Sequence, residues 1–295
     1  MDDGFELRKE GLRYLTPFNM VGAKNTLAQK IVPFIESIEH RLYVEPFGGA
    51  GGLLLNKPAP RVAEVYNDRN RLFCNLFRTL KDEAKAARIA ELAFSVPPIR
   101  CEYEKMKRLC LAYFHPDNEL EPLRNLIEAC GLGSEPDDVA LAYAAFYCMN
   151  CTFRGVVLDA FAPVEAGRPN TTLWLKAERL RCINERLKNV VVEERDVFEC
   201  IQKLDREWTL FYLDPPYICT ETNTYLYSWA KPEHEKLVEV LCEIKGKAIL
   251  SCYDDPTYLP LLKHGFEKVD FTHKTCVCNA AKGRGRTVET LYIKR

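Results

Sequence analysis

Apolar residues follow two patterns along the chain, one with the period of a helix and one as short continuous runs. Residues 24–37 carry apolar side chains every three or four positions, which predicts a helix. Strands are predicted over 41–47, 61–66, 190–194, 210–213, 248–251 and 287–294, and further helices over 71–94 and 233–244. Strands that alternate with helices are typical of an α/β fold with a mostly parallel sheet.

The segment from about 95 to 175 interrupts this alternation. It contains Pro97, Pro98, Pro116, Pro122, Pro136 and Pro163, with short helical pieces between them. This change in character predicts an inserted or helical second domain.

Composition places the chain among ordinary globular proteins. Its 295 residues suit one large domain or two modest ones, and 47% are hydrophobic and 28% charged. No apolar stretch approaches the roughly 20 residues of a membrane helix, and no secretory signal follows the acidic N-terminus, so we expect a cytoplasmic protein. With 41 basic and 42 acidic residues, net charge alone indicates no polyanionic partner.

Thirteen cysteines raise the question of a metal site. Cys148 and Cys151 form one close pair, and Cys276 and Cys278 form another. A structural zinc site needs four ligands, which these pairs could supply together. However, the apolar run 144–149 predicts a buried helix around Cys148, where free cysteine packs as a small hydrophobe. We therefore expect no metal.

A glycine-rich loop, residues 48–52, follows the first strand. It is not the dinucleotide fingerprint, because Leu54 stands where the third glycine is needed, and no Walker lysine follows. About 20 residues further on, Asp68 ends the second strand, where a carboxylate can accept the ribose hydroxyls of a bound nucleoside. The alternative is a tight turn in which Asp68 caps the next helix.

The sequence Asp214-Pro215-Pro216-Tyr217 follows another predicted strand. The two prolines fix the backbone, so the Pro215 carbonyl and the Asp214 carboxylate form two rigid acceptors suited to an exocyclic amino group. Tyr217 offers a face for a planar base. The alternative is a proline-stiffened turn. The nearby Tyr225, Tyr227 and Trp229 could shape a base pocket or pack on the core.

Four motifs together resemble the Dam-like DNA adenine-N6 methyltransferases, in the α-type order: 22–24, 44–51, 67–70 and 214–217. The resemblance runs from about residue 17 to the C-terminus. It implies an α/β, Rossmann-like methyltransferase sheet that uses S-adenosylmethionine, with an inserted, mostly helical target-recognition domain. The catalytic domain would comprise 1–78 and 180–295, and the recognition domain 79–179.

The resemblance also assigns roles to individual residues. The cofactor S-adenosylmethionine would contact Lys24, Phe47, Gly49, Gly51, Asp68, Asp196, Val197 and Phe198. Within this set, Asp68 would bind the ribose, and residues 196–198 the adenine moiety. The catalytic residues would be Asp214, Pro215, Pro216 and Tyr217, acting on an adenine flipped out of duplex DNA.

Local charge indicates where DNA could bind. Residues 263–295 contain eight basic and three acidic side chains, and the loop 282–286 combines glycine with positive charge, as a phosphate-contacting loop would. The alternative for this loop is a solvated hairpin turn. The expected DNA contacts are Asn150, Arg154, Lys282, Arg284 and Arg286. We expect duplex DNA as the partner, a monomer or weak dimer, and a cognate restriction endonuclease acting separately.

Other functions fit the same motifs. A methyltransferase for RNA adenine or protein glutamine would present a similar amino group to the Asp-Pro-Pro-Tyr sequence. The insert of about 80 residues and Asp rather than Asn at position 214 favour DNA. A non-catalytic DNA-binding regulator is the alternative from a different class, and the intact motifs argue against it.

Overall fold

The protein is described by a computed structural model covering 14–20, 22–58, 62–114, 123–152, 158–162, 164–165, 168–169, 172–218, 229–274 and 286–295. The chain divides into two compact units. The first, here called the helical unit, comprises Met1–Gln29, Gly49–Ala59 and Asp68–Glu194. The second, the sheet unit, comprises Lys30–Gly48, Pro60–Asn67 and Arg195–Arg295.

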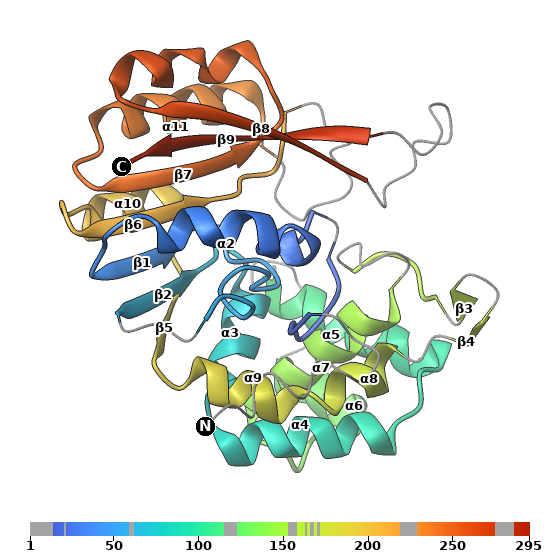
Figure 1. The fold of residues 1–295 in the computed structure, drawn as a ribbon. Helices are drawn as coiled ribbons and strands as arrows, with labels where there is room; N and C mark the ends of the chain where they lie inside the picture. Colours follow the sequence, from blue (N-terminus) through green and yellow to red (C-terminus); the bar gives the residue numbers. More distant parts are fainter. Residues whose placement is uncertain are drawn as a thin grey trace. The chain divides into compact units, whose positions relative to one another are not determined.

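Parallel strands form most of the sheet unit (Figure 1). The strands are β1 (Leu42–Glu45), β2 (Ala63–Asn67), β6 (Thr209–Leu213), β7 (Lys247–Cys252), β8 (Glu267–Lys274) and β9 (Arg286–Lys294). They follow the order β2-β1-β6-β7-β9-β8. The first four are parallel to one another, and β9 runs antiparallel to both β7 and β8. The central strand β6 is buried along its whole length, as expected for a parallel strand covered on both faces.

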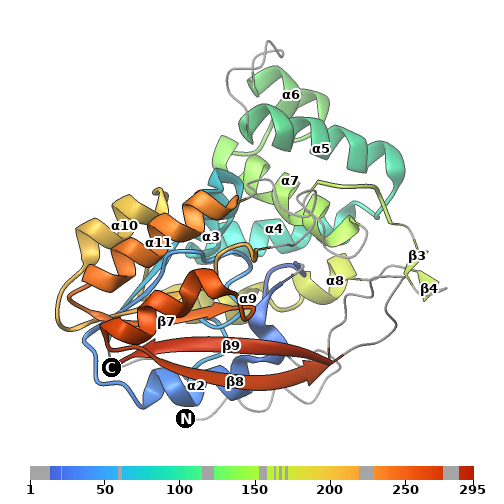
Figure 2. The same cartoon turned by 90° about the horizontal axis from the view of Figure 1, so that it is seen from above.

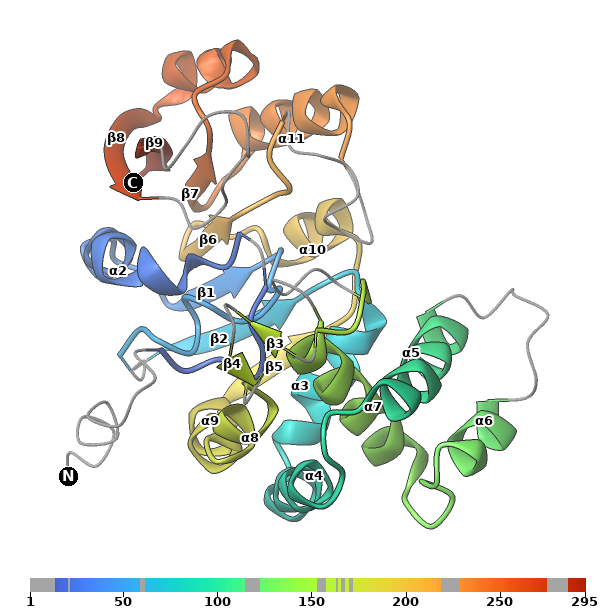
Figure 3. The same cartoon turned by 90° about the vertical axis from the view of Figure 1, so that its right-hand side faces the viewer.

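Helices cover both faces of this sheet. Helix α2 (Ala28–Glu36) lies on one face, whereas α10 (Val197–Leu204) and α11 (Lys231–Glu243) lie on the other (Figure 3). The 3₁₀ helix η5 (Pro256–His264) packs against α11. The apolar sides of α10, α11 and η5 join the buried residues of the strands in one core. This arrangement leaves the carboxyl ends of the parallel strands to carry the functional loops.

The helical unit is built around α7 (Asp137–Cys151) (Figure 2). Helices α3, α4, α5, α6 and α8 all pack against it. The unit consists of η2 (Lys24–Thr26), α3 (Arg71–Leu80), α4 (Glu83–Ser95), α5 (Arg100–Phe114), α6 (Leu123–Ala129), α8 (Thr172–Ala177), α9 (Leu180–Leu187), β5 (Val190–Glu193) and an antiparallel pair, β3 (Val164–Glu165) and β4 (Arg168–Pro169).

Helix α7 is apolar on all sides and is buried from Val139 to Cys151. Cys148 and Cys151 are both fully buried, which confirms the predicted buried helix. Cys276 and Cys278 lie outside the described residues. The described part of the chain holds no group of three or more His, Cys, Asp and Glu side chains that could bind a metal ion. Over the same ranges, no helix has both the length and the apolar character that crossing a membrane requires.

The predicted elements are mostly confirmed, with three differences. The helix predicted over 71–94 is two helices, because the Asp82 side chain accepts a hydrogen bond from the Lys85 backbone and starts α4 anew. The middle segment contains two helices of 15 residues, α5 and α7, rather than only short pieces. Strands β3, β4 and β8, helices α9 and α10 and the 3₁₀ helix η5 were not predicted. The domain boundaries at 79 and 179 remain a prediction.

Candidate active site

The glycine loop starts in the sheet unit, directly after β1. The Gly48 backbone N–H donates to the Asn67 carbonyl oxygen at 2.8 Å. A Cβ atom at Gly48 would lie 2.3 Å from the ring of the buried Tyr66, so no larger residue fits without moving that ring. The Asn67 amide donates to the Pro46 carbonyl and accepts the Arg195 N–H, both at 3.0 Å. Asn67 therefore joins the loop after β1 to the loop before α10.

The rest of the glycine loop belongs to the helical unit, where Asp68 holds it. Gly49 and Gly51 adopt positive φ angles of 49° and 68°, which favour glycine. The Gly49 N–H donates to one Asp68 carboxylate oxygen at 2.8 Å, and the Asn70 N–H donates to the other at 2.7 Å. The alternative that Asp68 caps the following helix is wrong, because Asn70 is the N-cap of α3.

Burial changes the acidity of Asp68. Desolvation raises the pKa of the Asp68 carboxyl to about 6, although the backbone N–H groups of Asn70 and Gly49 act in the opposite direction. This partly buried group therefore changes its ionisation close to neutral pH. Lys24, in η2 of the same unit, is buried and donates from Nζ to the Gly22 carbonyl at 3.1 Å.

Residues 196–198 begin α10 in the sheet unit. Asp196 is the N-cap of this helix and accepts the Phe198 N–H at 2.9 Å. The Phe198 ring stacks on Trp229 at 6.0 Å, and Phe47 meets the same indole edge-on at 5.1 Å between centroids. Trp229 packs with these rings against the core of the sheet unit, as one of the two alternatives for it predicted. Tyr225 and Tyr227 lie outside the described residues.

The Asp-Pro-Pro-Tyr sequence leaves the carboxyl end of β6. Pro215 is buried, whereas Asp214, Pro216 and Tyr217 are partly buried. The Tyr217 hydroxyl donates to the Glu289 carboxylate on β9 and lies 3.0 Å from Ser251 Oγ on β7. Desolvation, and then the charges of Asp214 and Glu289, raise the pKa of Tyr217 well above its usual value. Tyr217 is therefore a neutral phenol at any working pH.

Strand order brings two of the motifs to one edge of the sheet unit. Strand β1 pairs with β2 on one side and with β6 on the other, and all three are parallel. Phe47 and Gly48 follow the carboxyl end of β1, and Asp214 follows that of β6. Ligands of open α/β sheets bind where the strand order reverses in this way. The edge therefore carries the start of the glycine loop and the Asp-Pro-Pro-Tyr sequence.

Comparison with known proteins identifies the family. The model of the D12 class N6 adenine-specific DNA methyltransferases matches residues 21–272. The chain belongs to this family. A comparison with curated proteins finds no significant match. The resemblance seen in the sequence is thus confirmed, and the α/β fold agrees with it. The protein is an enzyme that methylates the N6 position of adenine in DNA, with DNA as substrate and a methyl donor as second substrate.

Of the five residues expected to contact DNA in this methyltransferase, the structure describes two, Asn150 and Arg286. Asn150, on α7, is only 2% exposed, and its amide donates to the Pro17 and Phe146 carbonyls. It thereby joins α7 to the segment before η2, and its contact with DNA stays a prediction. Arg154, Lys282 and Arg284 lie outside the described residues, and Arg286 begins β9.

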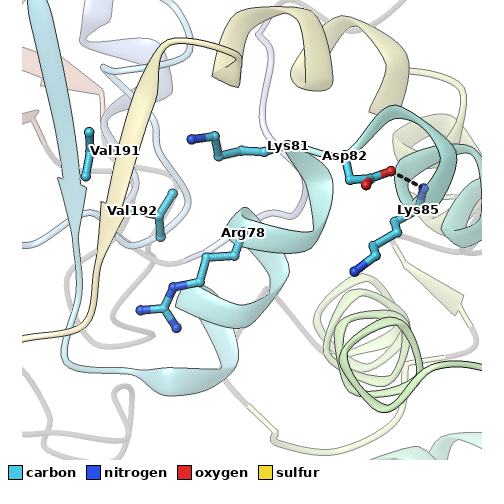
Figure 4. Close-up of a pocket in the computed structure, with 6 residues that line it drawn as sticks. All are labelled: Arg78, Lys81, Asp82, Lys85, Val191 and Val192. Atoms are coloured by element: carbon cyan, nitrogen blue, oxygen red, sulfur yellow. Dashed lines mark hydrogen bonds between the residues drawn. The ribbon is translucent and has the colours of Figure 1, made fainter.

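A basic hollow of about 620 Å³ lies between α3 and β5 of the helical unit (Figure 4). Its cations already have partners. Arg78 pairs with Glu194 at 2.9 Å, Lys81 donates to the Val190 carbonyl at 2.6 Å, and Lys85 pairs with Asp138 at 2.5 Å. None of its lining residues belongs to the predicted methyltransferase site, so we assign it no ligand.

Sequence reasoning gave no role to Ser251, Glu289 or Asn67. Each is buried, and each joins loops or strands that are distant in sequence. The signal that could have identified Glu289 is its position, since it is the lone acid of β9 and stands just before the apolar run 291–293. A charged side chain in such a strand costs stability unless it is hydrogen-bonded.

Proposed function

We propose that this enzyme transfers a methyl group from S-adenosylmethionine to an adenine rotated out of duplex DNA, within a short recognition sequence. The observation that carries the proposal is the Asp-Pro-Pro-Tyr sequence at the carboxyl end of β6, beside the loop after β1. A base inside a duplex cannot reach such a site, so the target nucleotide must leave the stack.

The residues present suit S-adenosylmethionine, which supplies a methyl group activated by a sulfonium centre. The aromatic rings of Phe47 and Phe198 offer apolar surfaces for the adenine moiety. The Asp68 carboxylate suits ribose hydroxyls, and Gly49 and Gly51 let a ligand approach the backbone closely. Lys24, Asp196 and Val197 complete the proposed contacts.

Negative charge at the sheet edge favours a cationic methyl donor. Burial raises the pKa of Tyr212 well above its usual value, and the charges of Asp214, Glu289 and Glu45 raise it further. The Asp214 carboxylate, at the carboxyl end of β6, would stabilise positive charge on the donor and on the amino group as its lone pair attacks.

The sequence Asp214-Pro215-Pro216-Tyr217, here called the tetrad, would hold the target amino group. The Asp214 carboxylate and the Pro215 carbonyl would accept its two N–H bonds, which orients the lone pair towards the methyl group. Neither Pro215 nor Pro216 has a backbone N–H that could compete for these acceptors. Tyr217 would stack on the base. Positioning and electrostatics then account for catalysis, with the proton of the methylated amino group passing to Asp214 or to solvent.

The test is transfer of labelled methyl from S-adenosylmethionine to unmethylated plasmid DNA, followed by single-molecule sequencing of the product. Wild-type protein should label adenine within one short sequence. Asp214→Asn should lower the rate at least about 100-fold, because the amide keeps one acceptor oxygen but carries no negative charge to stabilise the positive charge that develops on the amino group. Glu207→Gln is the matched control, since it removes an exposed carboxylate near the opposite end of β6 and should change nothing.

The outcomes separate the parts of the proposal. Label outside adenine, or an Asp214→Asn variant as active as wild type, would refute the assigned chemistry. Label in single-stranded DNA or RNA but not in duplex DNA would refute base flipping. Failure to bind S-adenosylmethionine by calorimetry would refute the proposed donor.

A further inference from the structure

Three groups of the sheet unit contact the Tyr217 side chain. Its hydroxyl donates to Glu289 and lies 3.0 Å from Ser251 Oγ. Ser251 Oγ in turn donates to the same Glu289 oxygen at 2.5 Å. Tyr253 meets the Tyr217 ring edge-on, with 4.5 Å between centroids and 74° between planes. The tyrosine is therefore tied to β7, to β9 and to the loop after β7.

Glu289 is an unusual residue for its position. Its side chain is 2% exposed, and Ser251 is fully buried. Burial of a carboxylate opposes folding unless the charge is hydrogen-bonded, and a hydrophobic residue at position 289 would avoid that cost. The strand thus carries a buried carboxylate that accepts hydrogen bonds from two hydroxyls, one of which is that of Tyr217.

Anchoring the hydroxyl restricts the ring. A tyrosine held only by its backbone can change rotamer and can turn about its Cβ–Cγ bond. A charge-assisted hydrogen bond at the far end of the side chain fixes both torsions, and such bonds are stronger than those between neutral groups. The plane on which a base can stack is then set before DNA binds, which lowers the entropic cost of the reactive geometry.

We propose that Glu289 is a positioning residue that fixes the Tyr217 ring for stacking on the flipped adenine. The inference rests on the proposed function and deepens it, because it assigns the orientation of the target base to a residue on a different strand. Glu289 itself touches neither substrate. Its effect passes through the Tyr217 hydroxyl.

The test is a double-mutant cycle with Glu289→Gln and Tyr217→Phe, measured as methyl transfer to duplex DNA. Glu289→Gln should lower kcat about tenfold and leave the KM for S-adenosylmethionine unchanged, because the charged acceptor is lost but the fold of the site remains. Tyr217→Phe, which keeps the ring but removes its hydroxyl, should have a similar effect. The double variant should lose no more than about tenfold, rather than the hundredfold of two independent effects.

Thr290→Val is the matched control. Thr290 neighbours Glu289 on β9, is equally buried, and donates to Asp270 at 2.7 Å. Its replacement removes a hydrogen bond from the same strand without touching Tyr217. It should lower the melting temperature and leave kcat unchanged.

Three results would overturn the inference: full kcat in Glu289→Gln, full kcat in Tyr217→Phe, or additive losses in the double variant. The second does not depend on how well the Glu289 variant folds. Equal losses of kcat in Glu289→Gln and Thr290→Val would assign Glu289 a purely structural role. If wild-type protein itself fails to methylate DNA, the proposed function falls instead, so the two failures are distinguishable.

Discussion

Asp68 should make binding of the methyl donor depend on pH between 5 and 7. Burial raises the pKa of this carboxyl to about 6, from an ordinary value of 3.8. If the ionised carboxylate accepts the ribose hydroxyls, the affinity for S-adenosylmethionine should follow the ionised fraction of Asp68 in the free protein.

The expected change is large enough to measure. With a pKa of about 6, roughly nine-tenths of Asp68 is ionised at pH 7 and roughly one-tenth at pH 5. The dissociation constant should therefore rise close to tenfold over this range. A carboxyl with its ordinary pKa of 3.8 would still be more than about nine-tenths ionised at pH 5, and the affinity would stay flat.

Stability changes in the opposite direction. Because the folded pKa is raised, the native protein binds a proton more readily than the unfolded chain between pH 3.8 and about 6. Asp68 therefore costs stability above pH 6, and that cost, about 3 kcal/mol, is relieved as pH falls through this window. Weaker binding at pH 5 would thus not reflect unfolding caused by Asp68.

The assay is isothermal titration calorimetry with S-adenosylmethionine from pH 5 to pH 8, with circular dichroism to verify folding. Asp68→Asn should bind weakly at every pH and show no step. Asp82→Asn should keep the wild-type profile, because asparagine also caps helices well and Asp82, the N-cap of α4, is not among the proposed contacts of the donor. A flat wild-type profile, or a step that survives in Asp68→Asn, would refute the reasoning.

Three further predictions follow from packing and burial. Gly48→Ala should lower stability by more than about 2 kcal/mol in urea unfolding, because its Cβ would lie 2.3 Å from the Tyr66 ring. Gly131→Ala, with open space around it, should cost only about 1 kcal/mol of backbone strain. Equal losses of stability in the two variants would contradict this. Lys176 is buried against Thr16, and desolvation lowers its pKa to about 7. The stability of the wild type should therefore rise between pH 7 and 10.5, whereas that of Lys176→Met should not. In thermal unfolding at pH 7, Lys176→Met should be more stable than wild type by a few kcal/mol. Trp229 contacts two residues proposed to bind the donor, so S-adenosylmethionine should change the tryptophan emission of wild type but not of Trp229→Phe; an unchanged wild-type spectrum would count against that placement.

The sequence by itself determined the family and most of the elements. Strand-forming runs, the glycine loop and the tetrad are local patterns, and each depends on neighbouring residues whose side chains alternate or whose backbone needs glycine or proline. The loops at 48–52 and 214–217 could be placed after strands for this reason. The break between α3 and α4 was missed because a single capping aspartate competes with a continuous helical pattern.

Tertiary structure decided which groups meet. Tyr217 and Glu289 are 72 positions apart, and only the antiparallel register of β7 and β9, with Cys252 opposite Thr290, brings β9 to the tetrad. Burial likewise gave Asp68 its raised pKa and removed Asn150 from the surface. Hydrogen-bond partners and solvation are properties of the packed state, because they depend on strand order and on what covers each group. The motifs therefore indicated the reaction, whereas the fold determined the hydrogen bonds and the burial of the residues proposed to carry it out.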